Sequence, residues 1–188
     1  MNVQEPAAPG KPNLVFLTPE LAEQLLQNMV PNRPVGKSRV EEMSRDIVAG
    51  RYLLNGDSLK VNSEGQLFDG QHRCHAVIKA QTGIWVWIFS DLEYTSALMA
   101  TVDCNKSRSR ADIWRLGELP FASSIPGALA VQWRYQNNKM NGTDRPTKQE
   151  EQILLGLHPG IMEGFHNPDV MGVGKKKLRS LGIAVGLF

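Results

Sequence analysis

This sequence has few cysteines, no long apolar run and no signal-like N-terminus. Its 188 residues include only two cysteines, Cys74 and Cys104, too few for a disulfide framework and without the spacing of a metal site. No run of about 18 apolar residues occurs, so we expect no membrane-spanning helix. The opening stretch MNVQEPAAPGKPN has neither the basic nor the apolar region of a secretory signal. These absences favour a protein of the reducing cytoplasm.

An excess of charge of one sign is also missing. The 21 Lys and Arg residues stand against 19 Asp and Glu residues, and the net charge of +2 is smaller than is usual in a DNA-binding domain. Basic residues nevertheless cluster locally at 105–115 and 174–179. The chain is 41% hydrophobic, which is enough for a core, and its length suits one domain or one and a half.

Hydrophobic spacing predicts an α/β domain that is followed by helices. We expect a helix over 17–30 with Thr18 as its cap, and a helix over 38–50 with a capping box of Ser38 and Glu41. Further helices are expected at 71–83, 94–102, 110–117, 124–136 and, after a cap formed by Thr147 and Glu150, 148–158. Period-two alternation predicts strands at 57–62, 66–69 and 84–90.

These elements predict the α/β (α+β) class, with a small mixed sheet flanked by helices and a helical C-terminal extension. The expected organisation is a flexible arm (1–16), an α/β domain (17–118) and a helical extension (119–188). In the third strand, Trp85 and Trp87 alternate with aliphatic residues, so we expect at least one aromatic face in the core and consider base stacking for the other face.

Polar groups crowd the turn inside LFDGQHRCHAV, residues 67–77. A strand that runs into a helix through Asp69 and Gly70 places backbone N–H groups and the positive end of the helix at one spot. Gln71, His72 and Arg73 add side-chain donors, and a guanidinium binds phosphate in a bidentate way. The pattern indicates a phosphate cradle. A helix cap with surface side chains explains it equally well, and both interpretations stay open here.

Two other segments are rich in donors. NRP (32–34) lies in a proline-stiffened loop, and DCNKSRSRAD (103–112) leads into an expected helix. The second segment is either part of a phosphate or nucleic-acid site or a solvated basic loop. Because phosphate recognition needs converging donors, we expect Gly70–Arg73 and Asn105–Arg108 to line one cleft, with Asn32 and Arg33 near its rim.

The order and spacing of these pieces over residues 18–118 resemble the ParB/sulfiredoxin superfamily, and most of all the short ParB-like proteins of phage and actinobacterial genomes. Those proteins carry a helix, two strands, an L-x-D-G-Q-H-R turn and an I-D-x-G-x-x-R-S segment. The resemblance implies a nucleotide site that uses a nucleoside triphosphate, CTP or ATP, with Mg²⁺. Gln71 stands where sulfiredoxin has its catalytic cysteine, so we do not expect sulfinic-acid reduction.

Roles for individual residues follow from the resemblance together with the donor pattern. The residues expected to bind nucleotide or phosphate are Gly70, Gln71, His72, Arg73, Asn105, Arg108 and Arg33. The residues expected to act in catalysis are Asp69, His72 and Arg73. Asp103 is the candidate metal ligand, with Asp69 as a second carboxylate. The candidates for contacts to nucleic acid are Lys106, Arg108 and Arg110.

The leading functional hypothesis is nucleotide binding in a phage or bacterial DNA-related process, within the bacterial host cytoplasm, with NTP hydrolysis or phosphoryl transfer as the expected chemistry. The partners that it implies are a nucleotide, DNA and a second copy of the chain in a homodimer, with no membrane. One alternative is a non-catalytic DNA-binding or regulatory protein that sets the same turn against backbone phosphate. Another is an interaction module that has kept the fold and lost the ligand.

Overall fold

The computed structural model describes residues 10–95 and 108–166, and the chain divides into two compact units, Met1–Cys104 and Asn105–Phe188. The division falls earlier in the chain than the expected boundary after residue 118. None of the helices in the described part of the chain is long and apolar enough to cross a membrane.

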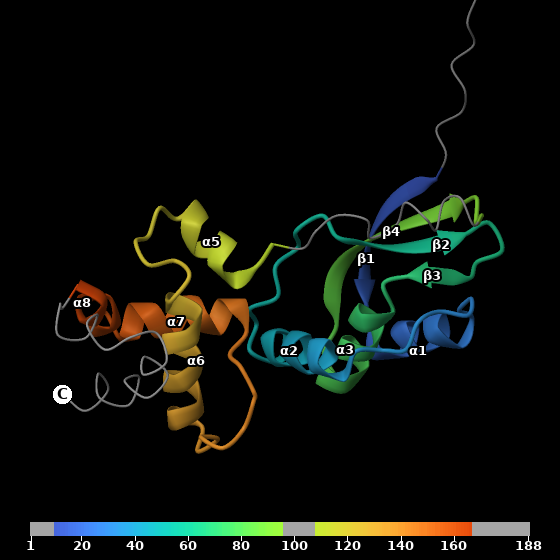
Figure 1. Cartoon of the computed structure of the whole chain (residues 1–188). Helices are drawn as coiled ribbons and strands as arrows, with labels where there is room; N and C mark the ends of the chain where they lie inside the picture. The colour runs from blue at the N-terminus through green and yellow to red at the C-terminus, as the bar shows by residue number, and fades with distance from the viewer. Residues whose placement is uncertain (1–9, 96–107, 167–188) are drawn as a thin grey trace, which may run out of the picture. The chain divides into compact units, whose positions relative to one another are not determined.

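The first unit is built on a mixed sheet (Figure 1). Its described strands are β1 (Lys11–Leu17), β2 (Ser58–Asn62), β3 (Leu67–Asp69) and β4 (Ile84–Leu92), in the spatial order β1-β4-β2-β3. β4 pairs antiparallel with β1 and parallel with β2, and β2 pairs antiparallel with β3. The small mixed sheet expected from the sequence is confirmed. β1 corrects the expected arm of residues 1–16, because residues 11–16 are all paired with β4.

Three helices pack against one face of this sheet. They are α1 (Pro19–Gln27), α2 (Lys37–Val48) and α3 (Gln71–Ala80), and α3 lies in contact with both of the others (Figure 1). The three helices and the strands share one core cluster, whose fully buried members include Leu17, Ala22, Leu59, Leu67, Cys74, Ala76, Val77 and Val86. The turn from Asp69 to Arg73, which joins β3 to α3 and which we call the motif turn, is therefore attached to the centre of the core.

The alternation along β4 turns its aliphatic side chains inward. Ile84 and Val86 are buried, whereas Trp85 is 53% exposed and packs edge to face against Phe16 of β1, which is 45% exposed. The expectation that an aromatic face of this strand would be core is wrong, because the helices cover the Ile/Val face and the aromatic side chains point the other way.

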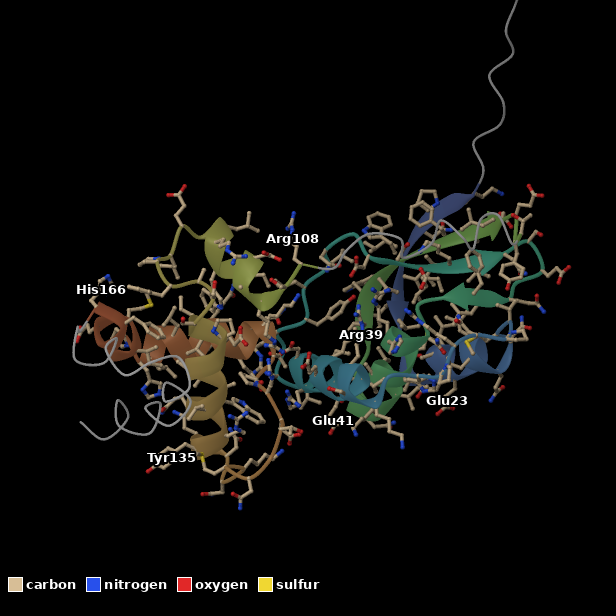
Figure 2. The ribbon with its side chains drawn as sticks, viewed as in Figure 1. Glu23, Arg39, Glu41, Arg108, Tyr135 and His166 are labelled. Atoms are coloured by element: carbon tan, nitrogen blue, oxygen red, sulfur yellow. The ribbon has the colours of Figure 1, made fainter. Side chains whose placement is uncertain are left out.

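The start of α2 also differs from the expectation. Gly36 is its N-cap, and no side chain of the described residues caps it. The expected capping box of Ser38 and Glu41 is therefore absent, and Glu41 instead forms an ion pair with Lys79 of α3. Arg39 and Glu41 are both carried by α2 (Figure 2). The box failed because the helix begins at Lys37, before the residue that the sequence pattern had identified as the cap.

The described part of the second unit is helical, as expected. Its helices are α5 (Arg110–Leu116), α6 (Ile125–Gln136), α7 (Lys148–Leu157) and α8 (Gly160–His166). They enclose a core whose buried members include Trp114, Ile125, Leu129, Trp133, Leu154 and Phe165. The capping box of Thr147 and Glu150 is confirmed. The expected helix at 94–102 lies almost entirely outside the described residues.

Candidate functional site

The motif turn can be built only with glycine at position 70. β3 ends at Asp69 and α3 begins at Gln71, with Gly70 as the N-cap at φ +103°. A Cβ atom at this position would lie 2.2 Å from Cδ2 and 3.3 Å from Cα of Leu59 in β2. Glycine is therefore required both by the backbone conformation and by the close approach of the turn to the neighbouring strand.

Gln71 and His72 bind a segment that precedes α2. The Gln71 side chain is 4% exposed, and its Nε2 atom donates to the carbonyl oxygen of Arg33 at 3.0 Å. The backbone N–H of Gly36 donates to Nε2 of His72, also at 3.0 Å. Both side chains that were expected to face phosphate thus hold the backbone of residues 28–36, which we call the strap.

The strap continues along the edge of β3 at its other end. The N–H of Val30 donates to the carbonyl oxygen of Leu67 at 3.0 Å, and the N–H of Leu67 donates to the carbonyl oxygen of Asn28 at 2.9 Å. Farther along, Nδ2 of Asn32 donates to the carbonyl oxygen of Phe68 at 3.0 Å. These bonds cover the β3 edge of the sheet and place Arg33 beside the motif turn, while its expected place at the rim of a cleft stays a prediction.

Arg73 is buried rather than presented to a ligand. The residue is 8% exposed, its Nη1 atom donates to the carbonyl oxygen of Ser58 at 3.1 Å, and its Nη2 atom lies 3.5 Å from Oδ2 of Asp57. Within the described residues, the buried Nε atom has no hydrogen-bond partner. Arg73 therefore joins α3 to the start of β2, and its charge is only partly balanced by an exposed carboxylate.

Tyr52 lies beside the same guanidinium. Burial raises the pKa of the Tyr52 hydroxyl, while the positive charge and a hydrogen bond of Arg73 act in the opposite direction and the charge of Asp57 adds to the increase. The sequence did not identify Tyr52 and Asp57 as neighbours of the motif. No local pattern could have done so, because they come from the irregular segment between α2 and β2.

Asp69 forms an ion pair inside the sheet. Its Oδ2 atom forms an ion pair with Nζ of Lys60 across the β2–β3 pairing, and neither side chain is more than about a third exposed. The roles expected for Asp69 in catalysis and metal binding would require this ion pair to open, and they stay a prediction. Asp69 is not the cap of α3 either, because Gly70 occupies that position.

The N-termini of α2 and α3 meet at the hydrogen bond between Gly36 and His72. Neither helix has an acidic residue in its first turn to balance the positive end of its dipole. Gly36 and Gly70 are the N-caps of α2 and α3, and in this described part no side chain caps either helix. The basic residues Lys37 and Arg39 lie in the first turn of α2 and are exposed. α1, by contrast, has a Thr18 cap and Glu20 in its first turn.

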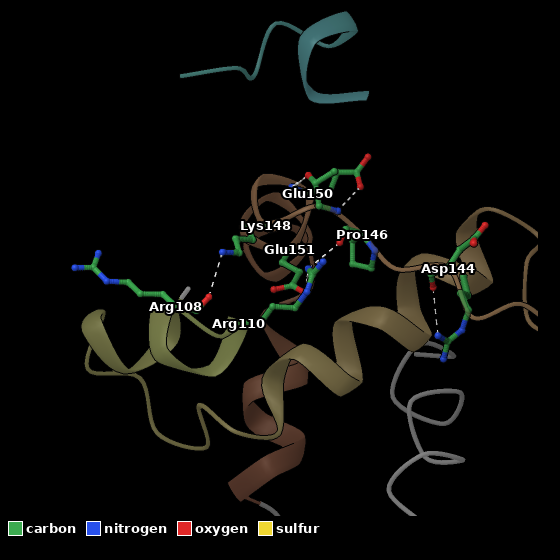
Figure 3. A network of polar contacts seen from close by, with 9 residues as sticks. Arg108, Arg110, Asp144, Pro146, Lys148, Glu150 and Glu151 are labelled. Atoms are coloured by element: carbon green, nitrogen blue, oxygen red, sulfur yellow. Dashed lines mark hydrogen bonds and ion pairs between the residues drawn. The ribbon is translucent and has the colours of Figure 1, made fainter. Parts of the chain in front are cut away.

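The described part of the second donor-rich segment, residues 108–112, lies in the second unit. Arg108 is exposed, and its backbone carbonyl oxygen accepts a bond from Nζ of Lys148 at 3.3 Å (Figure 3). Asp103, Asn105 and Lys106 fall outside the described residues. The hypothesis that Asn105–Arg108 and Gly70–Arg73 line one cleft stays a prediction.

Arg110 is engaged inside the second unit. Its Nη1 atom lies 2.5 Å from Oε1 of Glu151 and donates to the carbonyl oxygen of Pro146 at 2.8 Å (Figure 3). The two charged side chains are 18% and 3% exposed. Burial raises the pKa of the Glu151 carboxyl, and the charge of Arg110 opposes that change. In this arrangement Arg110 holds α5 against α7, so a contact to nucleic acid would need this pair to open.

The Cys74 thiol is buried in the core of the first unit, and burial raises its pKa to about 12. A thiol with that pKa is almost wholly protonated near neutral pH and is a poor nucleophile. Cys104 lies outside the described residues. The described residues include no group of three or more His, Cys, Asp or Glu side chains that could hold a metal ion.

Comparison of the chain with models of protein families, with curated proteins and with solved structures gives no match.

Proposed function

We propose that the first unit binds a phosphate-bearing ligand, in the first instance a nucleotide, where the N-termini of α2 and α3 meet. The observation that carries the proposal is the hydrogen bond from the N–H of Gly36 to Nε2 of His72, because it brings the N-cap of one helix to the first turn of the other. Each helix end carries about half a positive charge and unpaired N–H groups, so two ends side by side favour an anion between them.

The charges around this point support the same ligand class. Arg33, Lys37 and Arg39 are exposed basic residues on the strap and the first turn of α2. The buried guanidinium of Arg73 adds a further positive charge behind the first turn of α3. Helix N-termini are usually capped by their own acidic or hydroxyl side chains. Where the cap is glycine, the backbone N–H groups stay open to an anion such as phosphate.

The contacts favour binding over chemistry at this site. Asp69 is paired with Lys60, and the guanidinium of Arg73 is directed to Ser58 and Asp57. Phosphate contacts would then come from backbone N–H groups and the exposed basic residues, with Arg73 acting through its charge. The catalytic roles expected for Asp69 and Arg73 require these pairs to be exchanged for ligand.

The resemblance to ParB/sulfiredoxin proteins supplies the wider setting of the proposal. It points to CTP or ATP with Mg²⁺ as the ligand, to a DNA-related process of a phage or bacterium in the host cytoplasm, and to a homodimer as the assembly.

The test is a substitution that should weaken nucleotide binding without lowering the stability of the fold. Ser38→Asp places an acid in the first turn of α2, at an exposed position. It should leave stability unchanged or raise it by about 0.3–1 kcal/mol, because the carboxylate complements the helix dipole. The same carboxylate occupies and repels the anion site, so the affinity for nucleotide should fall about threefold or more. Ser38→Asn is the neutral control of the same shape and should keep most of the affinity.

Binding is measured as a thermal shift with CTP, ATP, GTP and tripolyphosphate, each with and without Mg²⁺. A ligand at about 100 times its dissociation constant adds about 2.7 kcal/mol of stability. Absence of a shift with all four ligands, or equal shifts in both Ser38 variants, would contradict the proposal. A shift with duplex DNA alone would favour the non-catalytic DNA-binding alternative.

A further inference from the structure

One of the bonds that hold the strap depends on the protonation of its acceptor. The bonds of Val30, Leu67 and Asn32 end on backbone carbonyl oxygens, as does the bond from Gln71 to Arg33. The bond from Gly36 ends on the imidazole nitrogen Nε2 of His72. A carbonyl oxygen accepts at any ordinary pH, whereas an imidazole changes its charge between about pH 5 and 8.

The bond specifies the state of the imidazole. Nε2 accepts a hydrogen bond only when it carries no proton, so the neutral ring has its proton on Nδ1. A second proton places an N–H group on Nε2, directly opposite the N–H of Gly36. The bond is then replaced by two opposed donors 3.0 Å apart.

This bond connects the N-terminus of α2 to the first turn of α3. Gly36 is the N-cap of α2, and its N–H is the group that the N3 side chain accepts from in a capping box. Here the acceptor comes from another helix, so His72 joins the start of α2 to the first turn of α3. A Cβ atom at Gly36 would lie 3.3 Å from Nε2, which shows how closely the backbone of Gly36 approaches the His72 ring.

Charged groups of both signs lie on the elements that meet at His72. Two helix N-termini meet there, each of which is the positive end of its dipole. α2 carries Lys37, Arg39, Glu41, Glu42, Arg45 and Asp46, and α3 carries Arg73, His75 and Lys79. Arg33 lies on the strap, Asp69 precedes Gly70 and pairs with Lys60, and Asp57 and Tyr52 lie beside Arg73. Within three positions of the two N-caps lie the basic residues Arg33, Lys37, Arg39 and Arg73 and one acid, Asp69, which pairs with Lys60.

We propose that His72 is a proton-operated latch, which holds the Gly36 end of the strap and the N-terminus of α2 on α3 when neutral and releases that end when protonated. The sign follows from the acceptor, since the bond is present above the pH at which His72 titrates and is lost below it. The bonds of Val30 and Gln71 lack this dependence, so release begins at Gly36 and leaves the β3 end of the strap in place. The inference does not rest on phosphate binding and is tested without a ligand.

The test is amide hydrogen exchange of Gly36 in the full chain, followed by NMR at pH 7.5 and pH 5.0 and corrected for the intrinsic effect of pH on exchange. The protection of Gly36 should fall at least about tenfold between the two conditions, while the His72 ring resonances report its titration. The amide of Val30 is the internal reference, because its carbonyl acceptor does not titrate in this range. Its protection should stay constant and shows that the unit remains folded.

Two variants separate the latch from a general effect of pH. In His72→Gln the amide oxygen lies near the position of Nε2 and accepts at both pH values, so the protection of Gly36 should be retained at pH 5.0. In His72→Phe no acceptor remains, and the protection should be low at both pH values. Constant protection of Gly36 in the wild type while His72 titrates would overturn the proposal. A fall of the same size in His72→Gln would also overturn it. If a variant does not fold, the comparison of Gly36 with Val30 in the wild type still tests the proposal.

Discussion

The buried guanidinium of Arg73 donates through Nη1 to the backbone carbonyl oxygen of Ser58, 3.1 Å away. The sequence presented Arg73 as a ligand for phosphate, and the fold uses it to join the first turn of α3 to the first residue of β2. The bond is partly buried and its donor is charged, so removal of the donor loses a charge-assisted hydrogen bond that is partly shielded from water. The same contact keeps the motif turn at a constant distance from the sheet.

Arg73→Ala should lower the free energy of unfolding of the first unit by about 2–3 kcal/mol, the usual cost of losing a buried hydrogen bond to a charged group. Hydrogen exchange of the core amides of that unit measures the loss. Lys79→Ala is the control, because the Lys79–Glu41 pair is half exposed and should contribute no more than about 1 kcal/mol. Unchanged stability together with lost nucleotide affinity would identify Arg73 as a direct phosphate ligand instead.

Gly70→Ala should cost more than Gly56→Ala, although both glycines have a positive φ, of +103° and +83°. At Gly56 no described atom lies within 4 Å of an added Cβ, so only the left-handed conformation is penalised, by about 1–2 kcal/mol. At Gly70 the Cβ also collides with Leu59, which adds about 1–3 kcal/mol. Chemical denaturation of the two variants measures the difference. Equal losses would show that β2 yields to the new methyl group.

The raised pKa of Glu151 predicts a pH dependence for the second unit. The folded state keeps the Glu151 proton to a higher pH than the unfolded chain does. Its contribution to stability is therefore fully present below the ordinary pKa of 4.5 and is lost as the pH rises through the raised value. Glu151→Gln lacks this titration and keeps an oxygen for Arg110. The free energy of unfolding of the wild type minus that of the variant should thus fall as the pH rises from about 4.

Asp112 titrates in the same experiment with the opposite sign, because hydrogen bonds with Ser109 lower its pKa. The wild type and Glu151→Gln share that group, so its effect cancels in the difference. A difference that is constant with pH would mean that Glu151 is ionised at no net cost, with Arg110 fully compensating its burial.

Cys74 should react with an alkylating reagent only after unfolding. Its pKa of about 12 leaves a negligible thiolate fraction at pH 7, and the side chain is buried. In a Cys104→Ser background, mass spectrometry of the native protein should find Cys74 unmodified, while the same protein in denaturant should be modified at once. Rapid modification of the native protein would show an accessible thiol and revive a redox interpretation of the GQHRC turn.

Local patterns determined most of the elements of this fold. The alternation of Ser58–Asn62, the strand at Ile84–Leu92, the Thr18 cap and the capping box of Thr147 and Glu150 all depend on residues close in sequence, and the structure confirms them. The passage from strand to helix through Asp69 and Gly70 was likewise expected, and β3 and α3 meet there. These features follow from short-range sterics and hydrogen bonding, which the sequence expresses directly.

Only the tertiary structure decided what the motif side chains contact. Gln71, His72 and Arg73 find their partners at Arg33, Gly36 and Ser58, each more than a dozen residues away along the chain. A donor-rich turn has the same sequence whether its donors face a phosphate or the backbone of a neighbouring segment. The same limit applies to Trp85, because the face of β4 that becomes core is chosen by the helices that cover it. Long-range packing, which no local pattern encodes, assigns these side chains.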